Sequence, residues 1–371
     1  MSNRQIEMLK TGGFLCKILL LAWCLAGSQL VQAQQQKSRS VSKAFRVNAL
    51  APVQLTGKYA KMDIRTWDKP EVSVEIRLVV KGRSMAEVEN MLERVEIDIS
   101  GDANGVMATA NIADSQQWNQ SGDGLRIRFR DGASLSLQSI EIHFSVHMPK
   151  NNPLKVDNKF GDISLGELAG NADIWLKYGK IQALSLSGSN KLSLGYAKAE
   201  IGYFGEGDFE ASYSEVEIDK LKSIRIDSRY SEIEIGSAGS ITAGNKYNDY
   251  SIGEVGTLIL DEKHGEVDIR RVGKMADVVM SYGAFAVASL GGSFERVKFA
   301  GEHVNFSLVV DPGASYAIDA AANHTKISFP QNLRLSEQIS TPGYEKIMGR
   351  VGANPKSTIY IRTDYGKVRV E

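Results

Sequence analysis

The chain has 371 residues, with 44 basic and 44 acidic side chains, so its formal net charge at pH 7 is zero. This balance argues against general electrostatic attraction to nucleic acid or to an anionic membrane. The length suffices for two domains or for one long repetitive domain.

Residues 1–33 are predicted to be a signal peptide. Three basic residues precede a short apolar run, ILLLAWCLAG, and a small-residue cleavage site lies before Gln34. The run is shorter than the roughly 20 apolar residues that span a bilayer. One alternative is a retained membrane anchor. Another is a lipoprotein modified at Cys24, although Trp23 stands where lipid attachment requires a small residue.

Both cysteines, Cys16 and Cys24, lie in this predicted leader. The exported chain would therefore have no disulfide, thiolate metal site or cysteine nucleophile. Cleavage would remove three basic residues and Glu7, leaving 41 basic and 43 acidic residues and a net charge of −2. We expect a protein that is not integral to the membrane after cleavage and that resides in the periplasm, on the outer membrane surface or outside the cell.

Residues 34–150 are predicted to form a small, strand-rich α+β cap lobe with one helix. The segment 71–80, EVSVEIRLVV, alternates as a half-buried strand does. Ser84 and Glu87 then have the spacing of a capping box. The apolar face of the predicted helix contains Met85, Val88, Met91, Leu92 and Val95. Residues 114–123 are polar and are predicted to form a loop.

Residues 151–310 repeat an aromatic residue at intervals of 17 or 18. The column reads Phe160, Tyr178, Tyr196, Tyr213, Tyr230, Tyr247, His264, Tyr282 and, more weakly, Phe299. Such regular periodicity is typical of stacked architectures. His264 is interpreted as a substitute for tyrosine in this column.

Apolar residues fill fixed positions after each aromatic residue. The column five residues after it reads Leu165, Ala183, Ile201, Ile218, Ile235, Ile252, Ile269 and Val287. An antiparallel meander of hairpins requires only alternation, whereas a parallel β-solenoid requires the same residue type at the same place in every coil. The columns therefore favour an all-β fold, a parallel β-solenoid with coils of 17–18 residues.

Residues 311–371 are predicted to close the solenoid. The segment 331–357 is predicted to be a long loop. The chain ends on DYGKVRVE, in which Tyr365 and Gly366 match the opening of a repeat, so a final coil is expected at this end.

Several of these segments together resemble a known family. TWDKPEVSVEI, VDNKFGDISLGELAG, the repeated YG or YS followed by Ile or Val, and TDYGKVRV are similar to the bacterial putative-adhesin families of exported β-solenoids, which are related to the head GIN domain. The resemblance covers residues 45–371. It implies a solenoid fold and supplies no catalytic residues.

No motif predicts catalysis. His143 and His147 lie four apart on a predicted strand, about 13 Å from each other, which is too far for one metal ion. No nucleophile elbow, zinc-protease motif or phosphate-binding loop is present. We therefore predict no catalytic, cofactor-binding or metal-binding residue. The alternative is a carbohydrate-active enzyme, a polysaccharide lyase or hydrolase on a solenoid scaffold.

Charged residues form columns of their own, and they supply the candidate binding face. Acidic residues lie two and four positions after the aromatic residue: Glu215, Glu217, Glu232, Glu234, Asp249 and Glu266. A basic column directly precedes the aromatic residue: Lys159, Lys177, Arg229, Lys246, Lys263 and Lys298. The favoured interpretation is a solvated structural surface whose acidic charge the basic column partly offsets. The alternative is a site for Ca²⁺ or for a basic partner.

The aromatic column also has two interpretations. Stacked rings at the coil corners are structural in one, and a platform for sugars in the other. Taken together, the sequence predicts an exported, non-enzymatic module of the cell envelope with an adhesive, structural or ligand-binding role. An envelope protein or a polysaccharide is the expected partner, nucleic acid is not, and no oligomeric state is predicted.

Overall fold

The computed structural model describes residues 34–121 and 124–371. These residues form 21 strands of one mixed sheet and one helix, which confirms the predicted all-β class. No helix in these two ranges is long and apolar enough to cross a membrane. The predicted signal peptide lies outside the described residues.

The chain divides into two compact units. Among the described residues, the first unit contains residues 34–38, 79–93, 114–121 and 124–140, and the second contains residues 39–78, 94–113 and 141–371. The elements up to residue 149 are β1 (Gln35–Arg46), β2 (Val53–Lys58), β3 (Ala60–Trp67), β4 (Glu71–Gly82), α2 (Met85–Arg94), β5 (Val95–Asp102), β6 (Gly105–Ile112), β7 (Ser115–Ser121), β8 (Gly124–Phe129) and β9 (Ser134–Pro149).

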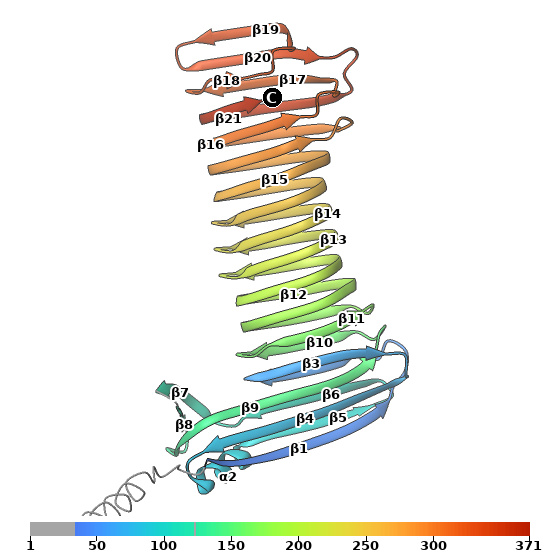
Figure 1. Cartoon of the computed structure of the whole chain (residues 1–371), viewed down its shortest axis with the longest axis vertical. Helices are drawn as coiled ribbons and strands as arrows, with labels where there is room; N and C mark the ends of the chain where they lie inside the picture. Colours follow the sequence, from blue (N-terminus) through green and yellow to red (C-terminus); the bar gives the residue numbers. More distant parts are fainter. Residues whose placement is uncertain (1–33, 122–123) are drawn as a thin grey trace, which may run out of the picture. The chain divides into compact units, whose positions relative to one another are not determined.

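The later elements all belong to the second unit. They are β10 (Leu154–Lys159), β11 (Ile163–Leu168), β12 (Ala172–Ser212), β13 (Glu215–Arg229), β14 (Glu232–Lys246), β15 (Asp249–Leu290), β16 (Arg296–Val310), β17 (Tyr316–Asn323), β18 (Ile327–Ser328), β19 (Arg334–Thr341), β20 (Tyr344–Val351) and β21 (Ser357–Val370). Figure 1 shows the successive turns of β12–β16 lying one above another.

The helix of the first unit begins where the capping box predicts. The Glu87 amide donates to Ser84 Oγ at 3.5 Å, and Val88, Met91 and Leu92 are buried. Met85, expected on the same face, is 39% exposed. The predicted loop at 114–123 is wrong, because β7 pairs antiparallel with β8. The hairpin is held together by backbone hydrogen bonds. Its side chains are mostly polar, so the sequence shows no apolar alternation that would predict the two strands.

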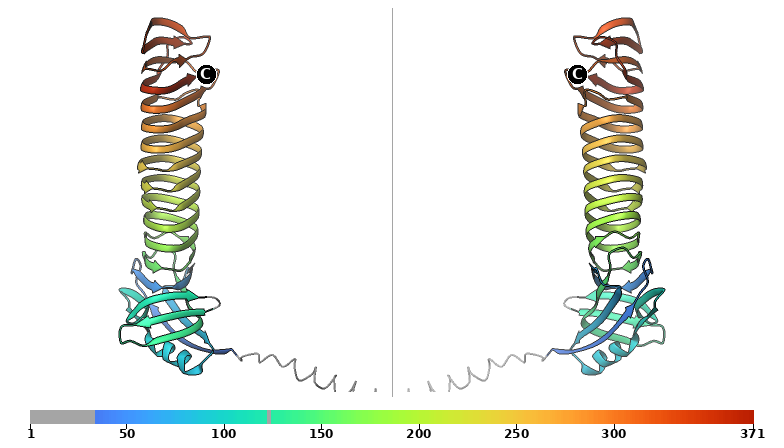
Figure 2. Two further views of the ribbon diagram at one scale, coloured as in Figure 1. Left: turned by 90° about the vertical axis from the view of Figure 1, so that its left-hand side faces the viewer. Right: turned by 90° about the vertical axis from the view of Figure 1, so that its right-hand side faces the viewer.

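Strands of the second unit pair in parallel at the period of the repeat. Ile218 on β13 lies opposite Ile235 on β14, which lies opposite Ile252 on β15. Leu154 on β10 lies opposite Ala172 on β12 in the same way. These strands therefore have the predicted parallel register and do not form an antiparallel meander. We call each period of the repeat a coil; Figure 2 shows the coils edge-on.

The core of this unit consists of the apolar columns. Ile218, Ile235, Ile252 and Ile269 are each at most 2% exposed, while their neighbours along the strand face solvent. The same alternation places residues that lie two and four positions after the aromatic residue on the outside.

One coil precedes the repeat that the sequence predicts. β2 and β3 pair in parallel with β10 and β11, so that Val53 lies opposite Leu154 and Met62 opposite Ile163. Tyr59 stands at its corner, with its ring stacked on that of Phe160. The long stretch of sequence between these two rings hides the coil from any search for a short, regular period.

The C-terminal strand is inserted and not outermost. β21 pairs in parallel with β16 on one side and with β17 on the other. β20 then pairs antiparallel with β17, and β19 with β20. The predicted long loop at 331–357 is therefore wrong, because it contains the β19–β20 hairpin. Most side chains of β19 are exposed, so no apolar alternation announces it.

Candidate functional site

The aromatic column forms one continuous stack. Twelve rings follow each other at centroid distances of 4.7–5.1 Å: Tyr59, Phe160, Tyr178, Tyr196, Tyr213, Tyr230, Tyr247, His264, Tyr282, His303, Tyr365 and His324. The expected roles of His264 and Tyr365 are confirmed. Phe299 is wrongly placed in this column, because it is buried in the core and His303 holds the corner.

All twelve residues have a left-handed backbone, with φ between 51° and 64°. This conformation turns the chain sharply at the corner and is unfavourable for a residue with a side chain. Glycine, alanine or serine follows nine of the twelve rings, and Asn248, Val304 and Thr325 follow the other three. At Gly179, for example, a Cβ would lie 2.2 Å from the carbonyl oxygen of Gly161 in the preceding coil.

The stack leaves ring edges exposed and covers ring faces. Tyr213, Tyr230 and Tyr247 are 45–48% exposed, and each lies nearly parallel to its neighbours, with interplanar angles of 2–8°. A sugar that packs on an aromatic side chain needs a ring face. The stack therefore fits the structural interpretation of the column, and a sugar platform does not fit it.

The six predicted acidic residues lie together on the outside of neighbouring coils. Glu215 lies opposite Glu232, Glu217 opposite Glu234, and Glu232 opposite Asp249. The Glu266 amide donates to the Asp249 carboxylate at 3.0 Å, which continues the row. All six side chains are exposed. We call these six residues the acidic ladder.

The basic column does not neutralise this ladder as the sequence suggested. Within the described ranges, Arg229, Lys246 and Lys263 form no ion pair with a ladder carboxylate, and Arg229 Nε instead donates to Ser212 Oγ at 3.0 Å. The aromatic corner separates each basic residue from the acidic residue three positions later.

Lysines of the preceding coils are the cations that reach this face. Lys198 pairs with Glu215, and Lys180 pairs with Glu200 at 2.6 Å. The hydrogen bond to Glu215 raises the pKa of Lys198, and that from Lys180 lowers the pKa of Glu200. An ion pair thus neutralises a ladder carboxylate at one end of the ladder, at Glu215.

Two hollows lie along this face. One of about 640 Å³ is lined by Glu234, Ser251, Asp268 and Arg270 among others, and one of about 470 Å³ by Glu200, Glu217 and Asp219 among others. In the part of the chain that is described, no three histidine or acidic side chains converge so as to hold a metal ion. The face thus offers carboxylates in a row, beside shallow hollows.

A buried polar chain runs beneath the corner. The Ser214 amide donates to Ser231 Oγ at 3.2 Å, and the Ser231 amide to Asn248 Oδ1 at 3.0 Å. The Asn248 amide and Nδ2 then donate to the carboxylate of Glu262, which is fully buried. Burial raises the pKa of Glu262 to about 7. The sequence signal for this group was its charge, because an uncharged residue stands two positions before each of the other eleven rings.

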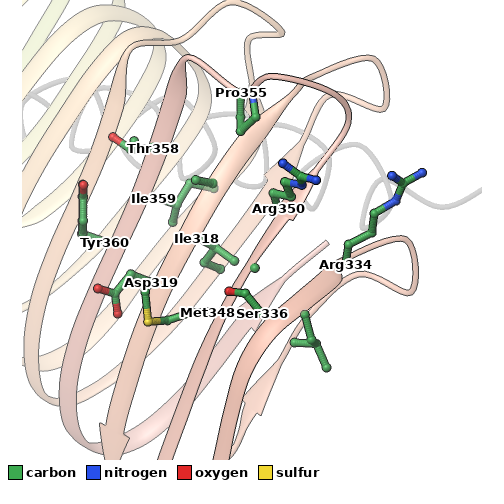
Figure 3. A pocket seen from close by; sticks show the side chains of 13 residues that line it. Ile318, Asp319, Arg334, Ser336, Met348, Arg350, Pro355, Thr358, Ile359 and Tyr360 are labelled. Atoms are coloured by element: carbon green, nitrogen blue, oxygen red, sulfur yellow. The ribbon is translucent and has the colours of Figure 1, made fainter.

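A third hollow, of about 540 Å³, lies over β17, β19, β20 and β21 (Figure 3). Arg334 and Arg350 lie at one end of it, and Asp319 and Tyr360 at the other. This site was not predicted from the sequence, because two of its strands, β19 and β20, lie in the segment 331–357 that was expected to be a loop. The available signal was the turn pair Pro342 and Gly343, which separates the two strands of the hairpin.

Comparisons with known proteins do not assign the chain to a family. No family model matches, and no curated protein matches. A solved "putative cell adhesion protein" from Clostridium sporogenes is 10% identical, with 90% of this chain and 100% of that chain covered and a TM-score of 0.20.

Two further solved structures are similar at the same low level. A "putative adhesin" from Parabacteroides merdae is 13% identical, with 72% of this chain and 95% of that chain covered and a TM-score of 0.31. A "putative adhesin" from Bacteroides fragilis is 11% identical, with 72% and 96% covered and a TM-score of 0.29. The family resemblance therefore stays a prediction.

Proposed function

We propose that the chain is an exported, non-enzymatic module of the cell envelope, a β-solenoid that presents the acidic ladder as a lateral binding surface. Export rests on the leader sequence. The expected partner is an envelope protein or polysaccharide that offers cations or hydrogen-bond donors in a row. The periplasm, the outer membrane surface and the exterior are all compatible with this role.

One observation carries the proposal. The ladder carboxylates stay in register over successive coils, while ion pairs formed by residues 34–121 and 124–371 reach only the end near Lys198. Like charges one strand spacing apart, about 4.8 Å, repel by about 1 kcal/mol in water. A partner with matching cations would relieve this repulsion, and a repetitive surface suits a repetitive or extended partner.

The enzyme alternative also has an observation in its favour. Glu234 and Asp268 line the same hollow and lie two coils apart, about 9.6 Å along the stack. Inverting glycosidases hold two carboxyl groups about 6.5–9.5 Å apart. Against this, both side chains are exposed, whereas a general acid needs a drier site that raises its pKa.

Cosedimentation separates the two functions. Residues 34–371 are incubated with purified envelope fragments, and bound protein and released sugar are both measured. The proposal predicts retention without product, weakened in a Glu215→Gln/Glu232→Gln variant. Asp227→Asn/Asp261→Asn, which removes two exposed charges from another column, is the matched control and should bind normally. Product release that Glu234→Gln and Asp268→Asn each abolish would establish the enzyme instead.

Calcium is tested separately. The ladder carboxylates lie in a row and do not converge on one point. We therefore expect that calorimetric titration of residues 34–371 with Ca²⁺ shows no binding with a micromolar dissociation constant. Micromolar binding that disappears in Glu215→Gln/Glu232→Gln would make the ladder a Ca²⁺ site.

A further inference from the structure

We propose that the hollow over β17, β19, β20 and β21 binds an acidic sugar, with Arg334 and Arg350 holding its carboxylate and Tyr360 packing on its ring. The site lies on other strands than the acidic ladder and has the opposite charge, so the inference goes beyond the proposed function and does not depend on it.

The two arginines are an unneutralised pair. Arg334 and Arg350 lie directly opposite each other on β19 and β20, and both are exposed. Neither guanidinium forms a hydrogen bond or an ion pair with any residue of the described ranges. Like charges in this position destabilise a strand pair. A bound anion would offset that cost, and arginine matches the planar geometry of a carboxylate.

The carboxylate that lines the hollow is already engaged. Asp319 Oδ2 accepts a hydrogen bond from the Arg362 guanidinium at 2.9 Å. Figure 3 places Asp319 at the end of the hollow away from the two arginines. The end lined by Arg334 and Arg350 therefore keeps its positive charge.

A small residue leaves room for the hollow between these groups. Ala317 lies opposite both Arg350 on β20 and Thr358 on β21. A bulge between Leu335 and Glu337 leaves Ser336 as the extra residue on the pocket wall. Bulges of this kind re-aim side chains next to binding sites. The volume of about 540 Å³ lies within the usual range of small-molecule pockets.

Tyr360 differs from the tyrosines of the stack. It is 41% exposed, and its ring contacts no other aromatic ring among residues 34–121 and 124–371. The ring lines the hollow, where the C–H face of a sugar can pack against it. The hydroxyl groups of Thr358, Ser336 and Tyr360 line the same space and can bind sugar hydroxyls.

Protection of the sheet edge is the competing explanation. Charged residues on an edge strand prevent pairing with other chains, and β19 is the edge strand of this hairpin. That role explains Arg334. Edge protection requires neither the second arginine on the paired strand β20 nor the exposed ring of Tyr360 in the same hollow.

Calorimetric titration of residues 34–371 with digalacturonate tests the proposal. We expect saturable binding that falls at least tenfold in Arg334→Gln/Arg350→Gln and severalfold in Tyr360→Ala. Arg225→Gln, which changes an exposed arginine outside the hollow, is the control and should bind as the unmodified chain does. Retained thermal unfolding shows that each variant is folded.

The other outcomes overturn the proposal. If digalacturonate does not bind, or if the double arginine variant binds it equally well, the hollow is not a site for an acidic sugar. If a neutral galactose disaccharide binds with the same affinity, the site does not recognise the carboxylate. If inorganic sulfate binds with the same affinity, the site recognises an anion and not a sugar. The ladder is intact in all these variants, so a failure here is distinct from a failure of the proposed function.

Discussion

At the scale of single residues, Glu262 makes the stability of the fold depend on pH. It is fully buried, and its polar contacts include the amide and Nδ2 of Asn248, at 3.4 and 3.3 Å. Burial raises its pKa from 4.5 to about 7. The folded state therefore favours the protonated acid more than the unfolded state does.

The stability contributed at this position should fall as the pH rises. Below pH 4.5 the carboxyl group is neutral in both states. Between pH 4.5 and 7 the unfolded chain ionises first, so unfolding becomes easier, and above pH 7 the loss is constant. The difference between the pKa values of the two states corresponds to about 3 kcal/mol of stability.

Denaturant unfolding at pH 4 and pH 8 checks this, with Glu262→Gln as the comparison. Because the variant cannot ionise here, its free energy of unfolding relative to the unmodified chain should rise by about 3 kcal/mol between the two pH values. Parallel pH profiles for the two proteins would mean that Glu262 is not buried as described.

Inward and outward positions of one strand should respond differently to a change of charge. Ile218 and Ile235 are at most 1% exposed, whereas Glu217, which precedes Ile218 on the same strand, is exposed. Ile218→Asp and Ile235→Asp would each bury an unpaired charge and should cost about 4 kcal/mol or more. Glu217→Gln should change stability by less than about 0.5 kcal/mol. Equal losses of melting temperature in all three would contradict the assignment of faces.

At the scale of elements, the aromatic stack joins the coils along their corner. Tyr230 lies 4.9 Å from Tyr213 and 4.8 Å from Tyr247, measured between ring centroids. Each such contact contributes about 0.5–1.5 kcal/mol. Tyr230→Ala should therefore cost about 1–3 kcal/mol.

The backbone at this corner gives a second comparison. Tyr230 has φ of 51°, which glycine adopts without strain and alanine does not. Tyr230→Gly loses the same ring contacts but relieves that strain, so it should be about 0.5–1 kcal/mol more stable than Tyr230→Ala. Urea unfolding of both variants measures the difference. An alanine variant as stable as the unmodified chain would show that the stack contributes nothing.

The elements also show which features a sequence can reveal. Columns such as Ile218, Ile235 and Ile252 predict the parallel register, because stacking requires one residue type at one place in every coil. The first coil at Tyr59 is hidden by a long insertion. The β19–β20 hairpin is hidden by its exposed side chains, and with it the pocket of Arg334 and Arg350.

The acidic ladder shows how far the sequence predicts exposed residues and their ion-pair partners. Its residues could be placed on the outside by alternation alone, and the structure places them there. The partner of Glu215 could also be predicted from the columns, because Lys198 stands two positions after Tyr196 and therefore lies directly opposite Glu215 on the neighbouring coil. The spacing pointed to Arg229, Lys246 and Lys263, whereas the cation that reaches Glu215 is Lys198, one coil earlier.

At the scale of the whole molecule, the account rests on successive copies of the repeat lying one strand spacing apart in parallel. The second unit supports this with parallel registers that advance by one period of the repeat at each step from β10 to β15. The ladder, the aromatic stack and the buried columns all follow from this one arrangement.

A distance between two spin labels tests this parallel stacking of the coils most directly. Both native cysteines lie in residues 1–33, so Gln182→Cys and Asp268→Cys would be the only thiols in residues 34–371. These positions occupy one exposed column, five coils apart, with Glu200, Glu217, Glu234 and Ser251 between them. Parallel coils predict a separation of about 24 Å between the two backbone sites in a pulsed dipolar measurement. A separation of about 48 Å, two strand spacings per copy, would show antiparallel hairpins and contradict the account.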